Sequence, residues 1–215
     1  MSERKFEDSI EIQASPEAVW KAITEGSEIA KWFAPIVRFK PGAGGEIYLS
    51  WGPGAEGTAP IVDWEEGKRY SWIEGEGSER PKIVEFSIEA KDSSTTTLRL
   101  VQSGFLHGGK FDDEFETTGS GWRTFLAMLK YNAENFAGAV AAHVWTMRIV
   151  PVPTPEAWAR VRQALELSEA ADGAPLRAKI GPVTVEGTIL RTPKAGYVCS
   201  KVTSAGDSLL AFFVE

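Results

Sequence analysis

The segment VEFSIEA, residues 84–90, has the clearest periodicity in the chain, because apolar and polar residues alternate along its whole length. Successive side chains of a strand point to opposite faces, so this strand would bury one face and expose the other. Such a pattern is typical of an antiparallel sheet that is covered on one side only.

The same period extends to both sides of this segment. Turn-forming stretches such as PGAGG and EEGK separate the alternating runs, as expected of consecutive antiparallel strands. The predicted strands cover residues 5–13, 36–40, 45–51, 58–64, 69–75, 82–91 and 95–104.

Helices are predicted before and after these strands. Ser15 followed by Pro16 is a helix start, and a second short helix is predicted at 27–33. A long helix is predicted at 120–137, because apolar residues recur there at intervals of three and four. This order of elements predicts an α+β fold, in which a curved sheet and a long helix can enclose a cavity for a small ligand.

Residues 143–215 are predicted to form a second, smaller α+β unit that follows a first domain of residues 1–142. A helix is expected at 154–171, and the predicted strands are 144–152, 182–190, 195–202 and 208–215. A unit of this size is marginally stable by itself. The alternatives for it are a truncated repeat, a lid over the first domain and a dimerisation arm.

The stretch WGPGAEG, residues 51–57, contains the pattern G-x-G-x-x-G of dinucleotide-binding loops. Such a loop needs a helix directly after it, whose N-terminus holds the pyrophosphate. The alternating segment TAPIVDW follows instead, so we expect a glycine-rich hairpin and no bound cofactor.

The composition indicates a globular protein that neither binds nucleic acid nor spans a membrane. The formal net charge is -7, no cluster of lysine and arginine residues could hold phosphates, and no apolar run could cross a bilayer. Residues 1–12 lack the apolar core of a signal peptide, so we expect a cytoplasmic protein. The single cysteine, Cys199, is expected to be a small buried apolar group.

Few residues suggest catalysis or metal binding. His107 precedes Asp112, Asp113 and Glu114, but this spacing fits no zinc pattern, so an exposed loop is expected. His143 is expected at the C-terminal end of the long helix. Because the sequence has no nucleophile elbow and no paired cysteine and histidine, we assign no catalytic residue and no metal ligand.

Aromatic side chains are the strongest candidates for a binding site. They come from different predicted elements that could converge on one cavity, and each brings a large apolar surface. An ordinary aromatic core is the alternative. Arg38, Asp63 and Glu85 could supply polar contacts, although the directions of their side chains are open. The candidate wall residues are Trp32, Phe33, Trp51, Trp64, Trp72, Phe86, Phe105, Trp122, Phe125 and Leu129.

Several short motifs follow one another in a characteristic order: SPEAVWKAIT, IAKWFAP, RYSW, VEFSIE, TTTLRLVQSGF and GWRTFLAMLK. In this order, residues 5–137 resemble the AHSA-type activators of the heat-shock-chaperone ATPase, within the START-like, polyketide-cyclase-like superfamily. The resemblance implies a helix-grip fold, in which a curved antiparallel sheet holds the helix at 120–137. It also implies a hydrophobic cavity whose wall would include Trp32, Phe33, Trp51, Trp72, Phe105 and Trp122.

Three functions are compatible with this resemblance, because one fold serves many functions. The first is non-catalytic binding of a small hydrophobic or aromatic molecule, and the second is regulation of a chaperone ATPase by protein contact. The third is cyclase- or hydrolase-type chemistry on an apolar substrate, with Asp63, Glu85 and His107 as candidate acid/base residues. A homodimer is also expected, since the strands of the tail need pairing partners.

Overall fold

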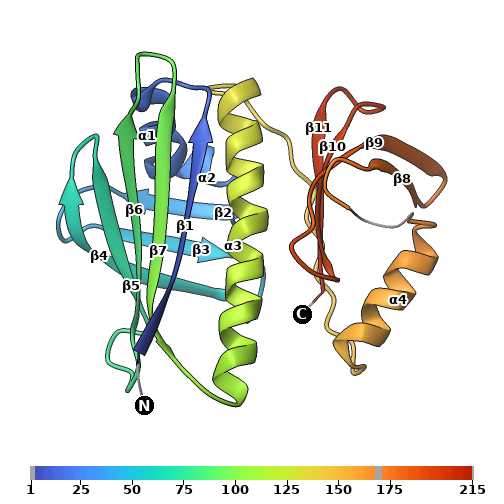
Figure 1. The fold of residues 1–215 in the computed structure, drawn as a ribbon, viewed down its shortest axis with the longest axis horizontal. Coiled ribbons are helices and arrows are strands. Elements are labelled where there is room, and N and C mark those ends of the chain that lie inside the picture. Colours follow the sequence, from blue (N-terminus) through green and yellow to red (C-terminus); the bar gives the residue numbers. More distant parts are fainter. Residues whose placement is uncertain (1–2, 168–170, 215) are drawn as a thin grey trace. The chain divides into compact units, whose positions relative to one another are not determined.

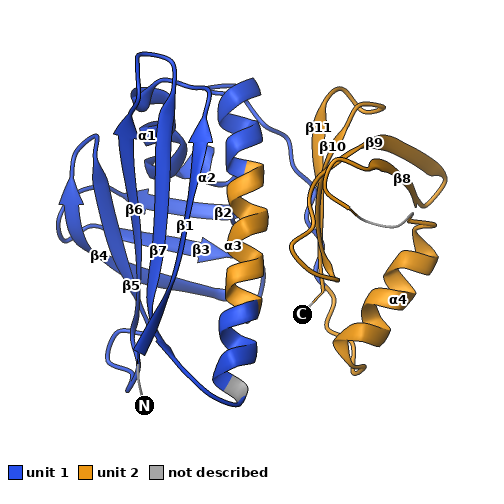
Figure 2. Ribbon diagram, in the orientation of Figure 1, with its two compact units in different colours: residues 1–116, 129–147 blue, residues 117–128, 148–215 orange. Residues whose placement is uncertain are grey.

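The computed structural model describes residues 3–167 and 171–214. The chain divides into two compact units (Figure 2). Unit 1 consists of residues 1–116 and 129–147, and unit 2 consists of residues 117–128 and 148–215. Among the described residues, no helix is long and apolar enough to cross a membrane.

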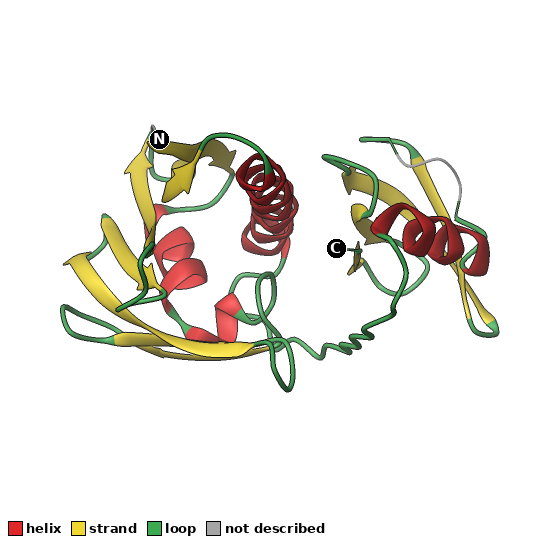
Figure 3. Cartoon of the chain, turned by 90° about the horizontal axis from the view of Figure 1, so that it is seen from below, coloured by secondary structure: helices red, strands yellow, loops and turns green. Residues whose placement is uncertain are grey.

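Unit 1 is built on a seven-stranded antiparallel sheet with the strand order β1-β7-β6-β5-β4-β3-β2 (Figure 1). Consecutive strands from β2 to β7 pair as neighbours, and β1 pairs with β7 at one edge. Figure 3 shows the strong curvature of this sheet. The strands are β1 (Glu3–Ile12), β2 (Ile36–Lys40), β3 (Glu46–Ser50), β4 (Glu56–Glu65), β5 (Arg69–Glu74), β6 (Lys82–Ala90) and β7 (Thr96–Leu106).

One face of this sheet, here called the inner face, is apolar. Val84 and Phe86 of β6 are fully buried on it, as the alternation predicts. The strand register places Tyr70 of β5 and Leu100 of β7 directly beside Phe86, and both are buried as well. The predicted antiparallel sheet with one covered face is therefore confirmed.

Helices α1 (Pro16–Thr24) and α2 (Gly26–Ile29) pack on the inner face, as contacts of α1 with β6 and β7 indicate. The last carbonyls of α1 have no partner within the helix. The Tyr70 hydroxyl donates to the Ile23 carbonyl at 2.6 Å, and the Trp32 indole donates to the Ala22 carbonyl at 2.9 Å. Inner-face aromatic residues thus complete the end of this helix.

Helix α3 (Lys110–Asn135) begins earlier than the predicted residue 120 and ends slightly before residue 137. Both of its ends are attached within unit 1. Arg4 of β1 donates to the Phe111 carbonyl at 3.1 Å, and Asn132 donates to the Lys31 carbonyl at 3.2 Å. The predicted helix-grip fold, a curved antiparallel sheet with one long helix, is confirmed.

Unit 2 contains a four-stranded antiparallel sheet with the order β11-β10-β9-β8 and one helix of its own. Its core includes Trp158, Leu176, Ile189 and Val198. Cys199 is fully buried as predicted, and burial raises the pKa of its thiol to about 12. The elements are α4 (Thr154–Ala164), β8 (Pro175–Ile180), β9 (Val183–Arg191), β10 (Tyr197–Val202) and β11 (Ser208–Phe213).

Residues 143–215 differ from the prediction at four points. The predicted strand at 144–152 is wrong, because residues 136–153 contain no helix or strand. His143 therefore does not end a helix, and its Nε2 lies 3.0 Å from the Pro35 carbonyl. Strand β8 was not predicted, and helix α4 is shorter than expected, although residues 168–170 of the predicted helix lie outside the described residues.

Candidate functional site

Six aromatic side chains of unit 1 form a continuous group, here called the aromatic cluster. Neighbouring rings have centroids between 5.2 and 6.1 Å apart, in stacked and edge-to-face arrangements. Because the rings touch one another, they form a packed core along this part of the inner face. The cluster consists of Trp32, Phe33, Trp51, Tyr70, Trp72 and Phe86, all but Tyr70 predicted as wall residues.

The other predicted wall residues of unit 1 lie apart from this cluster or at its edge. Phe105 is buried and packs edge-to-face on Phe115 of α3, with centroids 5.3 Å apart. Trp64 contacts Trp20 of α1 at 5.2 Å. Leu129 is fully buried on α3.

Trp122 and Phe125 belong to the part of α3 that is grouped with unit 2. Their rings are 6.2 Å apart, and Phe125 stacks on Phe213 of β11 at 5.1 Å. Phe125 is therefore part of the packing of unit 2.

The three predicted polar contacts lie on the outer face, opposite the aromatic cluster. Position 85 alternates with the buried positions 84 and 86, and Glu85 pairs across the sheet with Ser71, which in turn pairs with Asp63. Arg38 is exposed on β2. Each has a neighbour there: Tyr48 lies 3.8 Å from Arg38 (guanidinium to ring centroid), Arg69 lies 3.4 Å from Asp63, and Arg99 lies 3.5 Å from Glu85.

The glycine pattern forms a turn and His107 lies in a loop, as the sequence predicts. Residues 51–55 form the turn between β3 and β4, so no helix follows Gly52 and Gly54. His107 lies in the exposed loop before α3. No group of three metal-ligating side chains occurs in the part of the chain that the structure describes.

A polar pair that was not predicted lies on the inner face at the end of β5. Glu74 shares its face with Tyr70 and Trp72, four and two positions earlier in the strand. One carboxylate oxygen accepts from the Trp72 indole at 3.3 Å, and the other accepts from the Gln102 amide at 3.1 Å. Gln102, on β7, is buried with 3% exposure. We call Glu74 and Gln102 the polar pair.

The protonation of Glu74 is shifted by its surroundings. Burial raises the pKa of the carboxyl above its ordinary value, while the Trp72 hydrogen bond and the charge of Lys82 act in the opposite direction. Glu74 therefore keeps its proton to a higher pH than a solvated glutamate. A protonated carboxyl can donate one hydrogen bond, whereas the ionised form only accepts.

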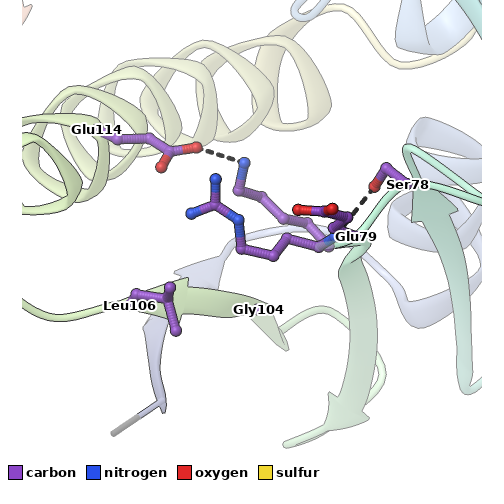
Figure 4. Close-up of a pocket in the computed structure, with 7 residues that line it drawn as sticks. Ser78, Glu79, Gly104, Leu106 and Glu114 are labelled. Carbon is purple, nitrogen blue, oxygen red and sulfur yellow. Dashed lines mark hydrogen bonds and ion pairs between the residues drawn. The ribbon is translucent and has the colours of Figure 1, made fainter. Parts of the chain in front are cut away.

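A pocket of about 330 Å³, which we call the mouth, is lined by strand neighbours of the polar pair, Lys82 opposite Glu74 and Gly104 two positions after Gln102 (Figure 4). Lys82 lies opposite Glu74 in the strand register and forms an ion pair with Glu114 of α3. Figure 4 shows Glu114 facing the loop that carries Ser78 and Glu79. The lining residues are Ser78, Glu79, Arg80, Lys82, Gly104, Leu106 and Glu114.

The two cations that line the mouth lie against aromatic rings. The Arg80 guanidinium lies 4.7 Å from the centroid of Phe111, and the Lys82 ammonium lies 5.5 Å from that of Phe105. Gly104 adopts a positive φ of 92°, and a Cβ there would lie 2.6 Å from the Pro81 carbonyl. Only glycine therefore permits this close approach of β7 to the start of β6.

Solved structures share this fold. The Aha1 dimer from Colwellia psychrerythraea is 21% identical, with a TM-score of 0.53, over 63% of this chain and 99% of that chain. The protein of unknown function EF2215 from Enterococcus faecalis is 23% identical, with a TM-score of 0.52, over 66% and 82%. DynU16, a putative protein in the dynemicin biosynthetic locus, is 17% identical, with a TM-score of 0.54, over 96% and 79%.

No curated protein matches the chain significantly. A family match exists, and it agrees with the order of motifs that predicted the helix-grip fold. Residues 13–134, more than half of the 215 residues, match the family described as "Activator of Hsp90 ATPase homolog 1-like protein", and the chain belongs to this family.

Proposed function

We propose that unit 1 binds a small, largely apolar molecule at the mouth and holds one polar group of that molecule against Glu74. The observation that carries this proposal is the polar pair on the inner face, whose strand neighbours Lys82 and Gly104 line the pocket. Burying polar groups costs free energy. A carboxyl and an amide beside a pocket can offset that cost by fixing the orientation of a ligand.

The size and chemistry of the mouth limit the ligand class. Its volume of about 330 Å³ is at the lower end for small-molecule sites, which span about 300–1,000 Å³. Leu106 offers apolar contact in the lining, and its cations Arg80 and Lys82 lie against the rings of Phe111 and Phe105. Glu74 offers one hydrogen-bonding position near Lys82. A compact aromatic or polycyclic molecule with a hydroxyl, carbonyl or amine group fits this description.

Native mass spectrometry of freshly purified protein, followed by solvent extraction, is the first test. We expect a stoichiometric apolar adduct, whose mass gives the ligand class. The same spectrum gives the oligomeric state, and a homodimer remains our expectation.

A variant pair localises the binding. N-phenylnaphthylamine, a neutral fluorescent probe, is titrated into the wild type and into Glu74→Leu, and into Glu85→Leu as the matched control on the outer face. Loss of one hydrogen bond should weaken binding by about fivefold to tenfold in the Glu74 variant only. Equal affinity in all three proteins would contradict the proposal.

Regulation of a chaperone ATPase is the second candidate, and the family match supports it. The test is a pull-down with an Hsp90-class chaperone together with its ATPase rate. We would abandon this candidate if the chaperone were not retained and its rate were unchanged.

Acid/base catalysis on an apolar substrate is the third candidate. Glu74 is better suited to it than Asp63, Glu85 or His107, because its pKa is raised and its cross-strand neighbour Lys82 lines a pocket. For any substrate identified by extraction, Glu74→Gln should abolish turnover but preserve binding. Unchanged turnover in this variant would exclude the role.

A further inference from the structure

Unit 2 contains a pocket of its own, of about 230 Å³. It lies between helix α4 and the connection from β9 to β10. Its lining residues are Trp158, Arg162, Thr192, Lys194 and Ala195.

The lining carries two cations and no acid. Lys194 donates to the Thr117 hydroxyl at 3.0 Å and lies 5.0 Å from the Tyr197 ring centroid, and both of these partners are neutral. Arg162 has no acidic partner within the described residues. Both cations are half-buried.

The acid that contacts Thr192 of the lining is already paired. Asp172 forms an ion pair with Arg191 at 2.7 Å, and its other oxygen accepts from the Thr192 backbone N–H at 2.7 Å. Asp172 therefore neutralises Arg191, and no ion pair within residues 3–167 and 171–214 compensates Arg162 or Lys194. This local excess of positive charge stands in a chain whose net charge is -7.

Two uncompensated cations in a recess attract an anion more strongly than the same cations on an open surface. Low-dielectric walls focus the field, and Trp158, which is only 8% exposed, supplies such a wall. Hydrogen bonds from charged donors to an oxyanion are shorter and stronger than neutral ones. Thr192 adds a hydroxyl donor to this set.

We propose that this pocket binds the carboxylate or phosphate group of a small anionic molecule. Arg162 and Lys194 neutralise the oxyanion, Thr192 donates to it, and Trp158 contacts the organic part. This site lies within unit 2 and does not depend on ligand binding at the mouth of unit 1.

The test is a pair of titrations at low ionic strength, followed by two-dimensional ¹H–¹⁵N NMR. Inorganic phosphate and benzoate are the probes, so that a preference for either oxyanion is visible. We expect saturable shifts of the Trp158 indole N–H and the Thr192 amide. Arg162→Gln and Lys194→Gln should each weaken binding about tenfold.

Lys179→Gln is the matched control, because Lys179 is a lysine of the same unit that pairs with Glu166 outside the pocket. Its affinity should equal that of the wild type. The proposal is overturned if neither probe gives a saturable shift, or if the control weakens binding as much as the pocket variants. If Lys194→Gln fails to fold, the affinity of Arg162→Gln alone tests the proposal.

Discussion

Glu74 is a half-buried acid whose pKa is raised, so the folded protein binds its proton more tightly than the unfolded chain does. The stability from this group is fully present below the unfolded-state pKa, near 4.5, and is lost as the pH rises through the higher folded-state value. We expect the melting temperature of the wild type minus that of Glu74→Gln to fall as the pH rises above about 4.5.

Glu17→Gln is the control with the opposite sign. The hydrogen bond from Lys21 lowers the pKa of Glu17, so its contribution is present at high pH and is lost as the pH falls. The corresponding difference in melting temperature should rise with pH. If the difference in melting temperature between the wild type and Glu74→Gln did not change with pH, the Glu74 carboxyl would be solvated.

Gly104 makes a second prediction at the level of one residue. Gly104→Ala would place a Cβ 2.6 Å from the Pro81 carbonyl in a backbone conformation that favours glycine. We expect a loss of about 1–3 kcal/mol in the free energy of unfolding, measured by urea denaturation. Gly57→Ala, where no atom lies within 4 Å of the new Cβ, should cost much less. Equal costs would mean that β7 can shift to accommodate the methyl group.

The alternation of side chains between the two faces of a strand explains which acidic residue belongs to the candidate site. In RYSWIE, Glu74 lies two positions after Trp72 and four after Tyr70, so all three side chains point to the same face. This alternation was sufficient to place Glu74 on the apolar face. By the same argument, Glu85 belongs to the outer face. The partnership of Glu74 with Gln102 was not predictable, because it depends on β7 in a register that no local pattern specifies.

The docking of helix α1 gives a prediction about a whole element. Tyr70→Phe removes the hydroxyl that donates to Ile23, and it leaves a buried carbonyl at the helix end without this donor. We expect a loss of about 1–3 kcal/mol in the free energy of unfolding, measured by chemical denaturation. Hydrogen exchange should increase most in the last turn of α1.

Tyr48→Phe is the control for this experiment. The Tyr48 hydroxyl donates to Glu56 at an exposed position, where water can replace it. Tyr48→Phe should therefore lower the free energy of unfolding only slightly. If both variants lowered the free energy of unfolding by a similar amount, the buried Tyr70 hydrogen bond would stabilise the protein no more than the exposed Tyr48 hydrogen bond.

Helices and strands with one buried and one exposed face were predictable from the sequence. Segments whose structure depends on neighbouring segments were not. Helix α3 was predicted to begin too late, because the segment KFDDEFETTG is rich in acids and poor in helix-forming residues, although Phe111 and Phe115 have helical spacing. Residues 144–152 have the composition of a strand, yet no neighbouring strand pairs with them. Residue type alone does not reveal that absence.

At the scale of the whole molecule, residues 136–153 are the part most open to a protease. They carry no helix or strand, and Arg148 is exposed and is the only lysine or arginine among them. We expect limited trypsin digestion to cut first after Arg148, giving fragments 1–148 and 149–215 by intact mass. Arg148→Gln should abolish this cut, and an earlier cut elsewhere would contradict the prediction.

The aromatic cluster also makes unit 1 an optical reporter of its own packing. Rings held at fixed angles give near-ultraviolet circular dichroism, which freely rotating side chains do not give. Tyr70 and Trp32 also hold the end of α1, so undocking this helix would disturb the same rings. A near-ultraviolet signal that fades before the far-ultraviolet signal would therefore mark a state with intact strands and helices but loosened side chains.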